Sequence, residues 1–216
     1  MDSPDISSLE TLQDIKRMME RSSRFISLSG LSGVSAGICA LVGAYVAHTW
    51  IVEYFHHPLY ERGEGGERYG YVNDAPKFVI LAATVLLAAL VSSFYFTWRK
   101  AHKNDLPFWD PTTKKLMINL AIPLVTGGLF VMGLLYHMAW GFVAPACLIF
   151  YGLALVNASK YTLSDIRWLG IFEILLGLIN IYYEQFSLYF WAVGFGLLHI
   201  IYGLMMWWKY DRGVKA

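Results

Sequence analysis

The chain has 216 residues, of which 56% are hydrophobic and only 15% are charged. In soluble domains about a quarter of the residues are charged, so this composition indicates a protein that lies in a lipid bilayer. The net charge is +1 and the 17 Lys and Arg residues form short clusters rather than a basic stripe, so nucleic acid is not an expected partner. The two cysteines, Cys39 and Cys147, lie in apolar runs and form no redox or metal motif.

Residues 1–28 precede the first apolar run and are expected to form a cytosolic or interfacial amphipathic helix. Ser7 and Glu10 fit a capping box, and apolar residues then recur at three, four or seven positions up to Ile26. The opposite side carries Lys and Arg, which suits either the surface of the cytosolic leaflet or a partner chain. Both interpretations stay open from the sequence.

Charge-free stretches predict six transmembrane helices. Residues 25–52 and 78–98 lack Asp, Glu, Lys and Arg and are each long enough to cross about 30 Å of hydrocarbon. Residues 116–159 would reach roughly 66 Å as one helix, so they are expected to form two helices that turn near Met138 to Gly141. The fifth helix is expected from Thr162, in a capping box with Asp165, to Tyr183, and the sixth from about 185 to 208.

The predicted fold is therefore an all-α integral membrane protein, an up-down antiparallel bundle of six helices over residues 29–210. A polar, Gly-rich outer loop is expected at about 51–76, and residues 211–216 form a cytosolic tail. With both termini in the cytosol, 14 of the 17 Lys and Arg residues fall on the cytosolic side, as the positive-inside rule requires.

Internal similarity indicates three repeated helical hairpins. The strings IFYGL (149–153) and IIYGL (200–204) recur, and the even-numbered helices all end in aromatic residues and Lys. Such anchors are common at helix ends, so chance similarity is the competing explanation.

Deeply placed polar residues are the first candidates for function, because each is costly in hydrocarbon. Counting about 1.5 Å per residue puts Glu173 roughly 12 Å and His199 roughly 15 Å from the cytosolic ends of consecutive helices, so they are expected to meet. The sequence predicts an intramembrane polar site in which Tyr151, Tyr202 and Asn119 join them. A hydrogen-bonded clamp between helices and a proton-linked site both fit these residues.

Two other patterns concern helix shape and packing. Pro123 removes a backbone hydrogen bond in the third helix, and Gly127 and Gly128 follow one turn later, which predicts a hinge. Small residues in the first helix predict close packing of a neighbour, either in the same chain or in a second copy. They are Ser29, Gly33, Gly37, Ala36 and Ala40.

Histidines gather near the predicted outer surface. Glu53 with His56 or His57 has the spacing of a helical metal pair, and His48 and His137 lie at similar depth, which would suit a bis-His haem. Interfacial histidines that bind nothing are the simpler interpretation, because His is amphipathic. We therefore expect no metal and no cofactor.

The sequence contains no nucleophile elbow, Walker loop, dinucleotide fingerprint or His-Glu-x-x-His motif, which disfavours a familiar enzyme. Three strings are distinctive: ERSSRFISLSGLSG (20–33), NLAIPLVTGG (119–128) and YGLALVNASKY (151–161). In these strings the chain resembles a family of uncharacterised multi-pass bacterial inner-membrane proteins. The resemblance implies a bacterial inner membrane and no particular activity.

Three functions remain for such a chain. The first is a non-enzymatic scaffold, accessory subunit or regulator that associates with itself or with another membrane protein. The second is a small transporter or channel with a proton-linked site at Glu173 and His199, and the third is a metal- or haem-binding membrane protein.

Overall fold

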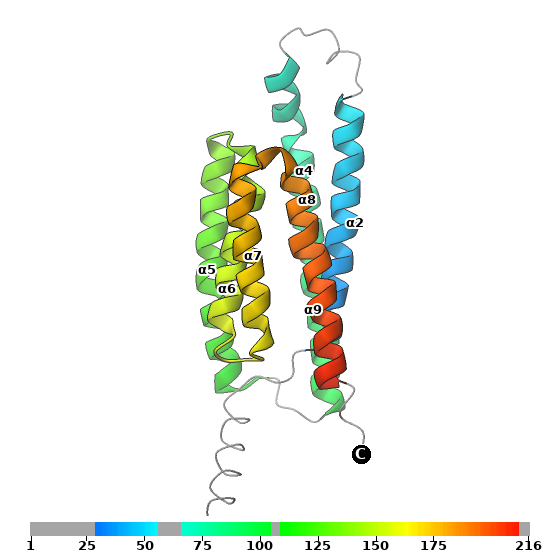
Figure 1. The fold of residues 1–216 in the computed structure, drawn as a ribbon, viewed down its shortest axis with the longest axis vertical. Helices are drawn as coiled ribbons and strands as arrows, with labels where there is room; N and C mark the ends of the chain where they lie inside the picture. Colours follow the sequence, from blue (N-terminus) through cyan, green and yellow to red (C-terminus); the bar gives the residue numbers. More distant parts are fainter. Residues whose placement is uncertain (1–28, 56–65, 105–108, 212–216) are drawn as a thin grey trace, which may run out of the picture.

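The computed structural model describes residues 29–55, 66–104 and 109–211, and these contain helices and no strand. The N-terminal segment 1–28 and His56 and His57 lie outside the described residues. Long helices stand side by side, and consecutive ones run in opposite directions (Figure 1). The α-helices are α2 (Gly30–Phe55), α4 (Gly66–Lys103), α5 (Pro111–Tyr136), α6 (Val143–Ala158), α7 (Asp165–Tyr182), α8 (Ser187–Trp191) and α9 (His199–Met206), of which α8 and α9 are short parts of one continuous rod.

The last long rod of the fold combines several helical types. A short 3-10 turn, η2 (Glu184–Phe186), leads into α8, and two π-helical segments, η3 (Ala192–Leu198) and η4 (Trp207–Asp211), flank α9. A further 3-10 turn, η1 (Trp140–Phe142), precedes α6. The turn between α5 and η1 lies where the sequence predicts one, and Met138 takes a positive φ of 59° there.

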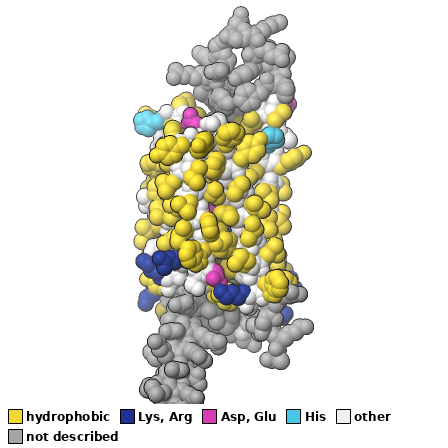
Figure 2. Space-filling view, viewed as in Figure 1, with side chains coloured by type: hydrophobic (Ala, Val, Ile, Leu, Met, Phe, Trp, Pro, Cys, Tyr) yellow, Lys and Arg dark blue, Asp and Glu magenta, His cyan; other side chains and the backbone are white. Residues whose placement is uncertain are grey.

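In the part of the chain that the structure describes, five helical segments are long and apolar enough to cross a membrane: Gly30–Glu53, Pro76–Lys103, Pro111–Tyr136, Trp140–Ala158 and Glu184–Asp211. α7 has 18 residues and is not among the five, because it carries three charged side chains, Asp165, Arg167 and Glu173. Apolar side chains cover the middle of the visible surface, while Lys, Arg and His lie toward its two ends (Figure 2). This belt is the surface expected of a protein that lies in a bilayer.

The helices pack in a row that does not close into a ring. α4 packs mainly on α2, α2 packs on η3 and α9, α7 packs most extensively on α6, and α6 packs on α5. α4 and α5 are thus the two edges of the assembly. The last two long rods, which would form the third predicted hairpin, pack more on α6 and on α2 than on each other.

Glycines allow the closest helix crossings. A Cβ atom on Gly152 of α6 would lie 2.5 Å from the carbonyl oxygen of Gly170, and one on Gly170 would lie 2.6 Å from that of Gly152. Real Cβ atoms do not approach so closely, so side chains at these two positions would push α6 and α7 apart. Gly33 of α2 lies in the same way against Gly203 of α9.

Several boundaries differ from the sequence-based expectation. α2 continues to Phe55 and α4 begins at Gly66, so both helices extend into the segment expected as a loop. α7 begins at Asp165 rather than at Thr162, and its N-cap residue Ser164 makes no side-chain capping bond. The Asp165 carboxylate accepts hydrogen bonds from Lys209 and Tyr210, at 2.9 and 2.8 Å.

Asp110 caps the start of α5. Its carboxylate accepts a hydrogen bond from the backbone N–H of Thr113 at 2.6 Å and one from the Thr113 hydroxyl at 2.7 Å. These bonds favour the charged carboxylate, and they lower the pKa of Asp110 from its ordinary value. Pro111 follows at the first helical position, where its missing N–H is not needed.

Candidate functional site: a sealed polar cluster between helices

Glu173 is the most deeply buried charged residue of the described chain. It projects from the middle of α7, and none of its surface is exposed. Its carboxylate lies against Gly194 of η3, where an added Cβ would come within 2.6 Å of Oε2 and 2.5 Å of Leu148 of α6. The absence of a side chain at Gly194 therefore makes the space that the carboxylate fills.

His199 lies beside Glu173, at the junction of η3 and α9. Its Nδ1 is 3.4 Å from Glu173 Oε1 and 3.0 Å from the backbone carbonyl of Gly194, while its Nε2 is 2.8 Å from the hydroxyl of Tyr151 on α6. A carbonyl only accepts, so Nδ1 carries the proton that reaches Gly194. In the neutral ring Nε2 then accepts the hydrogen bond that the Tyr151 hydroxyl donates.

Aromatic rings enclose the imidazole. Phe195 stacks on His199 with 6.0 Å between ring centroids and 27° between planes, and it also lies 5.2 Å from the Tyr151 ring. The ring of Trp191 packs on that of Phe195, with 5.4 Å between their centroids. Glu173 has no exposed surface and His199 is 6% exposed, whereas Tyr151 at the edge of the cluster is half-buried.

The π-helical geometry of η3 supports this arrangement. A π-helix widens the turn and leaves some carbonyls without an i to i+4 partner, and such segments are frequent at functional positions. Here the carbonyl of Gly194 accepts a hydrogen bond from Nδ1 of His199, five residues later. The backbone itself therefore orients the imidazole.

Glu173 makes fewer hydrogen bonds than its neighbours. Neither carboxylate oxygen accepts a hydrogen bond from any described residue, and the contact with His199 Nδ1 is long for a hydrogen bond. A buried polar atom without a partner costs free energy. The carboxyl group is thus held in place by packing and by the imidazole rather than by a complete hydrogen-bond network.

The other residues of the predicted polar site lie elsewhere. Tyr202 is one turn beyond His199, and its ring packs 6.4 Å from that of Phe172. Asn119 of α5 lies at the interface with α6, where Asn157 donates to its backbone carbonyl at 2.8 Å and to its side-chain oxygen at 3.2 Å. The structure therefore separates a central cluster from an amide contact between α5 and α6.

The residues predicted as a hinge lie in α5. Pro123 is inside the helix, and Gly127 is buried directly against the ring of Phe150. Gly128 faces open space, with nothing within 4 Å of where its Cβ would be. Close packing thus explains Gly127, whereas no contact of the described residues explains Gly128.

The small-residue face of α2 is occupied within the same chain. A Cβ on Gly37 would lie 2.6 Å from the Gly196 carbonyl, and Gly33 faces Gly203. Ala40 is 4% exposed, Ala36 is half-buried, and Ser29 is buried. Ser29, Gly33 and Gly37 thus pack on the last rod of the same chain.

Ionic contacts tie the helix ends together on the side where α4 finishes. Asp211 accepts from the Gly30 backbone N–H at 3.1 Å and the Ser29 hydroxyl at 3.2 Å, and it pairs with Lys100 at 2.7 Å. It therefore caps α2 and bridges to α4. Asp165 links α7 to η4 at the same end.

At the opposite end, a buried amide joins three segments. Asn180 of α7 is fully buried and donates to the Tyr183 carbonyl at 3.2 Å and to the Ser187 hydroxyl at 3.1 Å. The Ser187 hydroxyl in turn donates to the Gly141 carbonyl at 3.1 Å. These bonds fix the turn between α7 and α8 against η1.

The outer histidines are separate from one another. His48 is exposed and makes an edge contact with Tyr189, His137 is exposed at the end of α5, and Glu53 is exposed near the end of α2. Within residues 29–55, 66–104 and 109–211, no three His, Cys, Asp or Glu side chains are grouped as a metal site would require. A site involving His56 or His57 lies outside the described residues.

Sequence reasoning missed several residues of the central cluster. Gly194 and Phe195 are ordinary in a transmembrane sequence, and only the π-helical register brings them to His199. Asn180 carried a usable signal, because it is an amide inside an apolar run. In the sequence, Asp165 and Asp211 look like ordinary solvent-exposed residues at helix ends.

No protein family, curated protein or solved structure matches this chain. The site therefore has to be interpreted from its own chemistry. It has a carboxyl group, an imidazole and a phenol in one chain of contacts, which can pass or hold a proton, but no activated nucleophile is present among the described residues.

Proposed function

We propose that this protein is a six-span membrane protein, with both termini in the cytosol, of a bacterial inner membrane. Five apolar helices and the apolar belt support a location in the bilayer. α7 supplies the sixth span, because its charged side chains are buried or lie at its end. Most described cations lie at the end where α4 and α6 finish, which the positive-inside rule assigns to the cytosol. They are Arg99, Lys100, Lys103, Lys114, Lys115, Lys160, Arg167 and Lys209, with Lys77 toward the other end.

We further propose that the protein is a non-enzymatic scaffold or accessory subunit. The observation that carries this proposal is the complete burial of Glu173. A transport site has to exchange with water, whereas Glu173 and His199 are buried between α6, α7 and η3. Such a cluster holds helices in register, and interhelical polar contacts of this kind are usually structural.

The surface for association follows from the packing order. The small-residue face of α2 is used inside the chain, and α4 and α5 each pack mainly on a single neighbour. α4 is the more exposed edge, since no residue of its most apolar stretch is buried. Large side chains such as Leu87 and Leu90 project from it, at 67% and 59% exposure. We infer that another membrane protein, or a second copy, packs on α4.

Site-specific photo-crosslinking tests this function. A photoreactive phenylalanine analogue at Leu87 of α4 is compared with one at Leu175 of α7, which is also exposed but lies on a helix that already has neighbours on both sides. The proposal expects one discrete protein adduct from position 87 and none from position 175. Lipid adducts alone at both positions would contradict it.

A second candidate, proton-linked transport, has one observation in its favour. Both Glu173 oxygens lack a hydrogen-bond donor among the described residues, and the adjoining segment is π-helical. Strain of this kind is found where a helix changes conformation. The candidate requires a second state that opens Glu173 to water, and proton flux that depends on Glu173 would establish it.

A further inference from the structure

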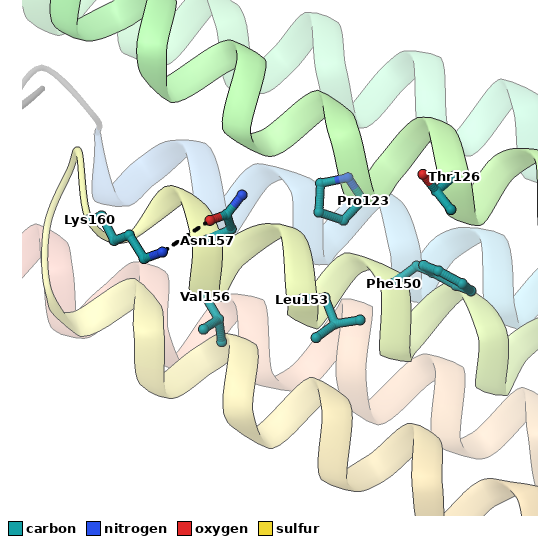
Figure 3. A pocket seen from close by; sticks show the side chains of 7 residues that line it. All are labelled: Pro123, Thr126, Phe150, Leu153, Val156, Asn157 and Lys160. Atoms are coloured by element: carbon teal, nitrogen blue, oxygen red, sulfur yellow. Dashed lines mark hydrogen bonds between the residues drawn. The ribbon is translucent and has the colours of Figure 1, made fainter.

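A groove runs along the outer surface of the molecule between α5 and α6. Its volume is about 370 Å³, and it opens to the surface. Figure 3 shows Lys160 and Asn157 at one end, and Phe150 and Thr126 at the other. It is lined by Pro123, Thr126, Phe150, Leu153, Val156, Asn157 and Lys160.

The groove arises from the way α5 meets α6. The two helices touch where Asn157 binds Asn119 and again where Gly127 lies against Phe150. Pro123 lies between these contacts and cannot donate a backbone hydrogen bond, which favours local bending of the helix. α5 and α6 supply most of the groove lining, and Lys160, in the turn after α6, completes it.

The two ends of the groove differ in chemistry. Leu153, Val156 and Phe150 make an apolar floor, whereas Lys160 is exposed at the end where α6 finishes and lies 3.4 Å from the Asn157 side-chain oxygen. Lys114 and Lys115 are exposed at the start of α5, at the same end of this helix pair. An occupant with an apolar body and an anionic head fits this division.

Its dimensions select the class of occupant. From Lys160 to Phe150 the helix rises about 15 Å, which is half of the roughly 30 Å hydrocarbon core. A helix of that length and about 10 Å diameter occupies on the order of 1,000 Å³, so it would lie over the groove rather than within it. A lipid chain is narrow enough, and one leaflet is as deep as the groove is long.

We propose that this groove is a binding site for one anionic phospholipid of the leaflet at the Lys160 end. The acyl chain lies along Leu153 and Phe150, and Lys160 binds the phosphate, with Lys114 and Lys115 adding to the positive potential. Basic pockets between transmembrane helices bind anionic headgroups in this way. The inference rests on the proposed location in a bilayer but not on the scaffold role.

The test uses full-length protein in a mild detergent, titrated with phosphatidylglycerol or with phosphatidylcholine of the same acyl chains. Bound lipids are counted by native mass spectrometry, and the melting temperature is followed in parallel. We expect one phosphatidylglycerol to be retained, with a rise in melting temperature that phosphatidylcholine does not match. Glycerol phosphate, which has the headgroup charge without the chains, should give no rise, and a rise would identify a simple phosphate site instead.

Two variants and a control localise the site. Lys160→Gln should weaken phosphatidylglycerol binding about fivefold, whereas Lys103→Gln, which removes an equivalent exposed charge at the end of α4, should leave it unchanged. Leu153→Trp should fill the groove and remove the retained lipid without affecting helix content. Equal retention of both lipids, or equal effects of Lys160→Gln and Lys103→Gln, would overturn the proposal. Those results would leave the scaffold role, tested by crosslinking on α4, unaffected.

Discussion

Asn157 donates a hydrogen bond at 2.8 Å to the backbone carbonyl of Asn119, the carbonyl that Pro123 would have engaged if it carried an N–H. In hydrocarbon an unsatisfied carbonyl is costly, and helix-breaking prolines are tolerated where a neighbouring helix supplies the missing donor. One side chain of α6 thus compensates for a proline in α5. The same contact closes one end of the groove between the two helices.

Removing that donor should therefore destabilise the protein in a way that depends on the proline. Asn157→Leu is expected to cost about 1 kcal/mol, the range measured for interhelical hydrogen bonds in membranes. In a Pro123→Ala background the helix regains its own N–H, so the cost of Asn157→Leu should fall. Thermal unfolding of the four proteins in detergent measures this coupling. Equal costs in both backgrounds would mean that the carbonyl does not need Asn157.

The Glu173 and His199 contact is open to the same kind of test. Removing either partner leaves a polar group buried, whereas removing both leaves only a packing defect, so the double change should cost less than the sum of the single changes. Glu173→Gln, His199→Phe and the double variant should show a coupling on the order of 1 kcal/mol by thermal stability. Additive effects would mean that the two side chains do not interact.

Gly194 should tolerate no side chain. Gly194→Ala would place a methyl group against Glu173 and Leu148, and overpacking of this kind costs about 1 to 3 kcal/mol. The matched control is Gly128→Ala on α5, where the space is open and the helix should gain up to about 1 kcal/mol. Opposite changes in melting temperature are expected. A neutral Gly194→Ala would show that η3 is not packed tightly on α7.

The orientation of the chain is tested by labelling. In a Cys39→Ala, Cys147→Ala background, a cysteine at Gly65 should react with an impermeant maleimide from outside the cell. A cysteine at Asn104, beyond the end of α4, should react only after the membrane is opened. The six-span arrangement with cytosolic termini fails if both positions react from the same side.

Much of the helical architecture follows from simple rules of sequence. Charge-free runs locate the apolar helices, and the length of 116–159 requires a turn, which the structure has at 137–139. Counting residues from the helix ends was also sufficient to bring Glu173 near His199, because straight antiparallel helices convert sequence distance into depth.

Other features depend on tertiary context that a single sequence does not contain. The Thr162 and Asp165 pattern predicted a helix start at Thr162, whereas α7 begins at Asp165, whose carboxylate binds Lys209 and Tyr210, more than forty residues away. Tyr202 and Asn119 were placed in the polar site by depth alone, but depth does not say which side of a helix faces a neighbour. The π-helical register of η3, which turns Gly194 and Phe195 toward His199, has no signature in the residue pattern.

The central claim is that Glu173, His199 and Tyr151 form a sealed structural cluster rather than a proton path. Proton flux into liposomes that contain the purified protein tests it most directly, with an internal pH dye and an imposed potential. The account predicts that wild-type protein and Glu173→Gln both give the flux of empty liposomes, while Glu173→Gln lowers thermal stability. Flux through the wild-type protein that Glu173→Gln abolishes, with stability unchanged, would contradict it.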